Sequence, residues 1–289
     1  MTTPNTGGDN AEPSAPFQWL HLRESLVSLA FVLFAVAFNL YHLYPEVAGE
    51  VRDANDMVFH LVMTEAAVDA ITQGRDPTDP WQGTMGMGFP LSLYYQHLPH
   101  VAIALVHVLT LGVFPLANML HWTTYLLLSL FPLSIYWSLR RFGFDRISSA
   151  SGGLVASLVA TNGIFGFGFG SYVFAGWGLY TQVWGMVLLP PAIAVSYRVL
   201  GEGRGYFWAT LLLAATLMSH LVYGYMAFLT LGMLAFIQPI QASSPQSVAE
   251  AMWSRWRRLI TLFLLVMVVT SYFLIPLLLN LDYFNRSIK

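Results

Sequence analysis

The residues best suited to chemistry lie in one short stretch, where Asp53, Asp56 and His60 follow one another at intervals of three and four positions. Such intervals place side chains along one face of a helix, and the sequence from Asp53 to about Thr72 contains few helix breakers. Two carboxylates and an imidazole could hold a divalent cation, and oxygen ligands would favour Mg²⁺ or Mn²⁺. Asp56 could instead act as a general base, with His60 orienting it or contacting a phosphate. The spacing equally suits an ordinary helix start, because Asp53 is a good N-cap and the helix dipole favours Asp56 in the first turn.

Residues further along the chain could complete a binding site. A turn rich in Gly and Pro comes after the predicted helix, and its Trp81 could stack on a sugar or lie at a membrane interface. The next segment carries Tyr94, Tyr95, His97 and His100, which favours an amphipathic helix whose histidines lie at the level of lipid headgroups. Two more polar residues, Gln182 and His220, occur in apolar surroundings and are further candidates for substrate binding.

The composition indicates where these residues must work. The chain has 289 residues, of which 56% are hydrophobic and only 10% are charged, whereas a soluble domain has roughly a quarter charged residues. The mean hydropathy is +0.59 and the net charge is −2, so a water-soluble enzyme, a disordered protein and a nucleic-acid binder are all excluded. The absence of cysteine excludes disulfides and thiolate sites. The sequence predicts an all-α polytopic membrane protein.

The apolar runs predict a disordered cytoplasmic tail over 1–20 and a membrane module over 21–289. An apolar run from 206 to 240 is too long for one crossing of about 20 residues, and Ser219 and His220 near its middle predict two short spans joined by a tight turn. About seven transmembrane helices are expected in all, near 26–43, 118–139, 147–164, 179–198, 206–220, 222–240 and 259–280.

Residues 91–114 are apolar enough to span the membrane, and the positions of the arginines indicate whether they do. The positive-inside rule requires all the arginine clusters to face the cytoplasm, and this holds only if 91–114 lies along the outer surface as an interfacial helix. The amino terminus is then cytoplasmic and the carboxyl terminus external. Eight of the 15 carboxylates fall within 46–79, which makes 45–116 the external loop where polar chemistry is concentrated. The arginine clusters are Arg140, Arg141 and Arg146, then Arg198 and Arg204, then Arg255, Arg257 and Arg258.

The loop motif resembles that of a known family. D-x-x-F-H-L at 56–61, Trp81, and G-M-G-F-P-L at 86–91 followed by Tyr94 and Tyr95 resemble the 6-pyruvoyl-tetrahydropterin synthase-related membrane proteins, which look like relatives of the GT-C glycosyltransferases. S-L-R-R-F-G-F-D-R at 138–146 and the histidine at 220 are similar to further features of that group. The resemblance implies a GT-C-like module with juxtamembrane helices in the first external loop. It also implies that an acidic residue there, Asp56, serves as base or metal ligand, with Asp53 and His60 beside it.

This resemblance leads to two hypotheses. In the first, the protein transfers a sugar from a polyprenyl-phosphate donor, entering from the bilayer, at the outer face of a prokaryotic plasma membrane. In the second, it is a catalytically degenerate GT-C-like subunit of a larger membrane complex. The second is motivated by the short chain, by Met63 where relatives commonly have arginine, and by Gln182 where they commonly have an acid. A channel or transporter would rest on the multiple spans alone.

Overall fold

The computed structural model describes residues 15–48, 56–83, 88–90, 93, 95–158, 180–237 and 248–281. Within these ranges the regular structure is helical apart from two strands of two residues each, which pair antiparallel with Trp81 opposite Pro90. The elements are α1 (Ala15–His42), α2 (Pro45–Ala48), α3 (Asp56–Thr72), β1 (Trp81–Gln82), β2 (Phe89–Pro90), α4 (Leu98–Leu109), α5 (Leu116–Phe142), α6 (Arg146–Leu158), α7 (Tyr180–Glu202), α8 (Tyr206–Ser219), α9 (Leu221–Ile237) and α10 (Val248–Leu279).

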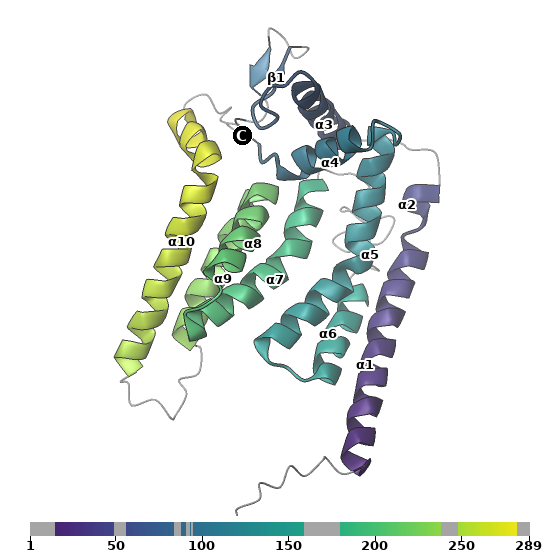
Figure 1. Ribbon diagram of the computed structural model, residues 1–289, viewed down its shortest axis with the longest axis vertical. Helices are drawn as coiled ribbons and strands as arrows, with labels where there is room; N and C mark the ends of the chain where they lie inside the picture. Colours follow the sequence, from purple (N-terminus) through teal and green to yellow (C-terminus); the bar gives the residue numbers. More distant parts are fainter. Residues whose placement is uncertain are drawn as a thin grey trace, which may run out of the picture.

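Most helices run along the long axis of the molecule, whereas α3 and α4 lie together across one end of the bundle (Figure 1). Buried apolar residues of α7, α8, α9 and α10, among them Leu200, Leu213 and Leu231, form the largest core cluster. Helix α4 has 12 residues, far fewer than the ~20 needed to cross a bilayer. Its placement across the end of the bundle agrees with the interfacial position expected for 91–114.

The long apolar run splits into two helices where the sequence predicts a turn. Helix α8 ends at Ser219, His220 adopts an extended conformation with φ −158° and ψ 113°, and α9 begins at Leu221. The two helices pack closely, since a Cβ built on Gly224 would lie 2.8 Å from the Cα of Leu217. Small residues at such positions allow helix backbones to approach one another in membrane proteins. The expected division into two short segments joined by a tight turn is confirmed, whereas neither helix is among those long enough to cross a membrane.

Within the part of the chain that the structure describes, three helices are long and apolar enough to cross a membrane, by length and composition: Leu22–Ala48, Tyr180–Glu202 and Val248–Leu279. This fits an α-helical membrane protein, but it is fewer than the about seven spans expected. Helices α8 and α9 are apolar but have only 14 and 17 residues. Helix α5 has 27 residues but is not among the sufficiently apolar ones. Large apolar side chains remain exposed on the outer helices, for example Leu33 at 57% and Val268 at 71%, as contact with lipid would require.

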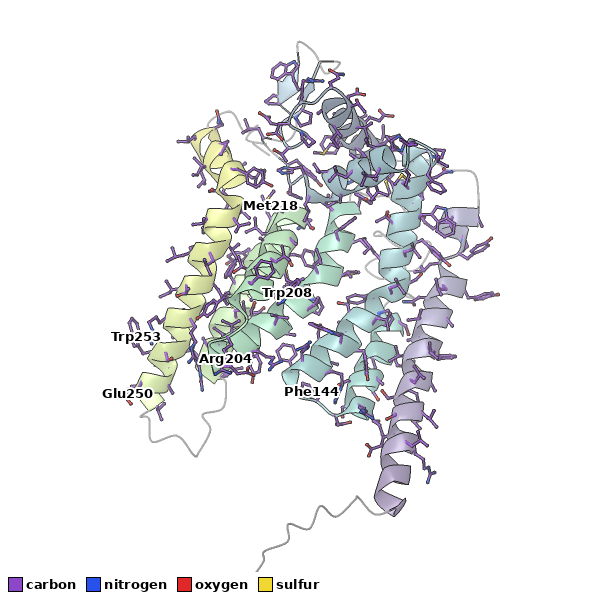
Figure 2. All side chains as sticks on the ribbon, in the orientation of Figure 1. Phe144, Arg204, Trp208, Met218, Glu250 and Trp253 are labelled. Carbon is purple, nitrogen blue, oxygen red and sulfur yellow. The ribbon has the colours of Figure 1, made fainter. Side chains whose placement is uncertain are left out.

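The arginine clusters gather at the end of the bundle opposite α3 and α4. Arg140 and Arg141 close α5, and the chain turns into α6 through Gly143, whose φ of +100° favours glycine. Arg258 of α10 donates to the carbonyls of Leu200 and Gly201 at the end of α7, both at 2.7 Å. Arg146 of α6 bonds the Ser25 hydroxyl of α1. Figure 2 labels Phe144, Arg204, Glu250 and Trp253 in this region, here called the arginine end.

Candidate active site at the histidine end

A buried group of rings lies where α3 and α4 cover the bundle, and we call it the histidine cluster. His60 comes from α3, Tyr95 and His97 precede α4, His100 is in its first turn, and Tyr180 begins α7. Apolar residues hold α3 and α4 in place, because Met57, Ile103 and Leu120 pack with Tyr180 in one buried core. This end of the molecule, with α3 and α4, is the histidine end.

Two of the histidines form a direct hydrogen bond. Nδ1 of His60 lies 3.0 Å from Nε2 of His100, so one ring donates and the other accepts. Their ring centroids are 5.2 Å apart, and the Tyr180 ring lies 5.3 Å from that of His60. Tyr95 contacts the pair from another direction, with its centroid 6.0 Å from that of His60. The four rings therefore join α3, α4 and α7.

The third histidine ties α4 to the last helix. Nε2 of His97 lies 3.0 Å from the hydroxyl of Tyr272, and the ring of Phe273 packs against the imidazole at 5.6 Å. His97 and Tyr272 are 175 positions apart in the sequence. The contact fixes the upper part of α10 beside the histidine cluster.

Burial determines the charge of the three imidazoles. His60 and His100 are each 1% exposed and His97 is 3% exposed. Removal from water disfavours a cation, and it lowers the pKa of His60 and of His97 to about 4, although the charge of Asp76 partly offsets this at His97. The pKa of His100 is lowered well below its usual value, first by burial and then by the neighbouring His60 and His97. At neutral pH all three rings are uncharged.

Each of the three neutral rings has one nitrogen that forms no hydrogen bond within the described residues. Nε2 of His60, Nδ1 of His97 and Nδ1 of His100 are buried, and none has a hydrogen-bond partner among the described residues. Buried polar atoms are usually paired, because leaving them unpaired costs free energy. The cluster therefore holds three buried ring nitrogens whose hydrogen-bonding capacity is not used within the described residues.

Asp56 lies at the rim of this cluster. It is the first residue of α3 and is exposed to solvent. Its negative charge acts on Tyr95, whose pKa is raised mainly by burial and further by Asp56, while a hydrogen bond to Thr181 opposes the rise. The hydroxyls of Tyr95 and Thr181 are 3.1 Å apart. The arrangement therefore combines an exposed carboxylate with a neutral, buried polar interior.

The predicted metal site is described only in part, because Asp53 lies outside the described residues, as does Tyr94. His60 is turned into the interior and bonds His100, and no hydrogen bond joins it to Asp56 among the residues that the structure describes. Within the same ranges no group of three or more histidines and acids is placed to hold a metal ion. Among the expected ligands that the structure describes, Asp56 has an exposed carboxylate that a cation could reach.

A pocket of about 180 Å³ opens beside His97. Its lining is mixed: Asp76, Thr78, Asp79 and Tyr272 are polar, and Leu93, Phe273 and Pro276 are apolar. Asp76 is held in a turn because its carboxylate accepts hydrogen bonds from the backbone N–H and the hydroxyl of Thr78, at 2.8 and 2.7 Å. The pocket could admit a small polar group to the edge of the cluster.

Trp81 is the first residue of strand β1, and 57% of it is exposed to solvent. A Cβ on Gly88 would lie 2.3 Å from the indole of Trp81, and Gly88 has a φ of +106°. Only glycine fits both conditions without strain. The loop thus holds an exposed indole near the cluster, where it could stack on a sugar ring.

His220 and Gln182 form a separate polar group at the top of α7, α8 and α9. The His220 ring packs edge-on against Tyr223 at 5.3 Å, and the Tyr223 hydroxyl is within hydrogen-bonding reach of Gln182. Helix α7 can approach His220 closely because Gly185 has no side chain. A Cβ on Gly185 would lie 3.0 Å from the Cβ of His220. No hydrogen bond or ring contact joins His220 to the three clustered histidines within the described residues.

His97 and His100, which the sequence predicts at headgroup level, are both buried within the protein. His107, in the last turn of α4, is partly exposed and bonds the carbonyl of Phe114 at 2.9 Å. Tyr180 and Tyr272 contact the clustered histidines, although the sequence did not predict them as site residues. Both occur in apolar helices, and no motif distinguishes them from ordinary interfacial tyrosines.

Comparison of the chain with protein-family models, with curated proteins and with solved structures gives no match. The function proposed for the chain therefore rests on its residues and on the geometry of the histidine end.

Proposed function

We propose that this protein is a membrane glycosyltransferase of the GT-C type, which transfers a sugar from a polyprenyl-phosphate donor. The observation that supports this most directly is the exposed carboxylate of Asp56 at the rim of the buried, uncharged histidine cluster. A carboxylate in that position can receive a proton from an acceptor hydroxyl.

In the proposed reaction, Asp56 removes the proton from an acceptor hydroxyl. The acceptor oxygen then attacks the anomeric carbon of the sugar, and the bond from that carbon to the phosphate oxygen breaks. The electron pair of this bond leaves with the polyprenyl phosphate, and the configuration at the anomeric carbon is inverted. Trp81, with Tyr94 and Tyr95, would contact the sugar, while Gln182 and His220 would contact the donor where it enters from the bilayer.

A divalent cation, Mg²⁺ or Mn²⁺, fits this proposal if Asp56 and Asp53 hold it, because exposed carboxylate oxygens are the ligands such ions prefer. When bound, the ion would neutralise charge on the departing phosphate. His60 is less suited to that role than the sequence predicts, since its Nδ1 already bonds His100.

The proposed setting is a prokaryotic plasma membrane. The arginine clusters lie at one end of the bundle and the histidine cluster at the other, and the positive-inside rule would put the arginines in the cytoplasm. We infer about seven spans, with the short apolar helices α8 and α9 among them. The amino terminus would be cytoplasmic and the carboxyl terminus external.

The test is transfer from a polyprenyl-phosphate sugar by Asp56→Asn in membranes. We expect loss of transfer by roughly two orders of magnitude or more, as for removal of a general base, with unchanged membrane insertion. Glu65→Gln is the matched control, because it removes an exposed acid from the same helix away from the cluster. Full activity in Asp56→Asn would overturn the proposal.

A second candidate, a catalytically degenerate GT-C-like subunit of a larger membrane complex, is favoured by one observation. The three clustered histidines are neutral, so they provide no positive charge for a departing phosphate. This alternative predicts that the protein co-purifies with other membrane subunits and that transfer is absent in the unaltered protein as well.

A further inference from the structure

A second pocket lies at the arginine end, far from the histidine cluster. It has a volume of about 400 Å³ and lies between α5, α7 and α8. Its lining includes Trp137 and Arg141 of α5, Arg198 of α7, Arg204 in the α7–α8 turn, and Trp208 and Leu212 of α8. Arg204 and Trp208 are labelled in Figure 2. We call it the arginine pocket.

The arginine pocket carries more positive than negative charge. Arg198 is paired with Glu202, also in the lining, through contacts of 3.1 and 3.2 Å. The guanidinium carbon of Arg141 lies over the Trp137 ring, 4.8 Å from its centroid. Arg204 has no hydrogen bond or ion pair within the described part of the chain. Three arginines against one glutamate leave a surplus of two positive charges.

The same pocket has an apolar part. Trp208 is 60% exposed and Trp137 is 38% exposed, and Leu212 lies one helical turn beyond Trp208 on α8, toward the middle of the bundle. Tryptophan is typical of the interface between headgroups and acyl chains. The pocket therefore places cations at the level of a phosphate and apolar rings at the level where acyl chains begin.

We propose that the arginine pocket binds an anionic phospholipid, with the phosphodiester on Arg141 and Arg204 and the glycerol and first acyl carbons on Trp137 and Trp208. Basic pockets between membrane helices on the cytoplasmic side bind such headgroups. A soluble phosphate would use the arginines but would leave the tryptophans and Leu212 uncovered. The proposal requires only that the protein lies in a membrane, so its test does not depend on whether the protein transfers a sugar.

The experiment compares binding of phosphatidylglycerol, phosphatidylcholine and inorganic phosphate to the full chain in detergent, by native mass spectrometry and by the shift in melting temperature. We expect phosphatidylglycerol to bind about tenfold more tightly than phosphatidylcholine, because the surplus positive charge of the arginines would repel the choline cation of the latter. Arg204→Gln should weaken phosphatidylglycerol binding by about fivefold, which corresponds to one basic residue at the surface. Arg257→Gln is the matched control, because Arg257 is exposed at the same end and does not line the pocket.

Each other outcome would overturn the proposal. Equal weakening in Arg204→Gln and Arg257→Gln would mean that diffuse surface charge attracts the lipid. Equal binding of the anionic and zwitterionic lipids would remove the role of the arginines. Stabilisation by inorganic phosphate as large as that by phosphatidylglycerol would identify a soluble anion as the ligand. Melting of each variant without lipid checks that Arg204→Gln still folds.

Discussion

Most arginines of the arginine end are exposed to solvent, whereas the histidine end buries its ionisable rings and thereby makes them neutral. Arg198 pairs with Glu202 on an exposed surface, and Arg258 satisfies carbonyls at the end of α7. His60 and His100 instead bond each other in the interior. The difference follows from the side chains, because a guanidinium cannot shed its proton while an imidazole can.

The two ends of the molecule are suited to different kinds of ligand. The arginine end presents fixed positive charge and is suited to phosphate at any ordinary pH. The histidine end has uncharged, buried rings with one exposed carboxylate, Asp56, beside them. The first arrangement suits recognition of an anion, and the second suits proton transfer at the carboxylate.

Acid should destabilise the histidine end specifically, and this is the largest effect we expect. His60 and His97 have pKa values lowered from 6.5 to about 4, so between these values the unfolded chain binds protons that the folded chain does not. Stability is therefore complete above pH 6.5 and falls as the pH drops toward 4, by up to about 1.4 kcal/mol per pH unit for each histidine. Melting temperatures measured from pH 7.5 to 4 would show this.

The acid effect can be assigned with two variants. His97→Gln should reduce the loss of melting temperature between pH 6.5 and 4, because one buried titrating ring is removed. His107→Gln should leave the loss unchanged, since His107 is on the neighbouring helix α4 but only partly buried. The same loss in both variants would show that the clustered histidines are not its source.

At the arginine end, Arg258→Gln should have a smaller effect that does not depend on pH in this range. The substitution removes two hydrogen bonds from a cation to the carbonyls of Leu200 and Gly201, and we expect a loss of about 1–2 kcal/mol in the free energy of unfolding. Arg257→Gln, an adjacent and exposed position, should cost little. Equal melting temperatures for the two variants would show that the carbonyl contacts do not stabilise this end.

The smallest effect is expected from Gly88→Ala beside Trp81. A Cβ at this position is strained by the positive φ and would meet the indole at 2.3 Å, so we expect a loss of about 1 kcal/mol together with displacement of Trp81. Gly83→Ala is the control, because a Cβ there meets nothing within 4 Å. Tryptophan fluorescence and melting together measure both effects. An unchanged spectrum in Gly88→Ala would show that the loop does not fix the indole.

Local sequence patterns predicted several elements well, because short-range signals determine them. The polar pair at 219–220 places the break between α8 and α9, and the apolar run expected near 118–139 lies within α5. The distribution of arginines predicted that their clusters share one end of the bundle, and contacts such as that of Arg258 with Leu200 agree.

The histidine cluster could not be predicted in this way. His60 and His100 are 40 residues apart and are brought together by the packing of α3 on α4, and His97 meets a tyrosine near the other end of the chain. No periodicity links such positions. The i, i+4 spacing of Asp56 and His60 suggested one shared face, but the structure exposes the carboxylate and buries the imidazole, because only the later residue of the pair reaches the α4 contact.

The most direct test of the account is whether the two ends lie on opposite sides of a membrane. The chain has no cysteine, so single cysteines can be introduced at exposed positions of each end, Gln73→Cys beyond α3 and Arg257→Cys in α10. We expect a membrane-impermeant maleimide to label Gln73→Cys in intact cells and Arg257→Cys only after permeabilisation. Labelling of both from the same side, or the reverse pattern, would contradict the account.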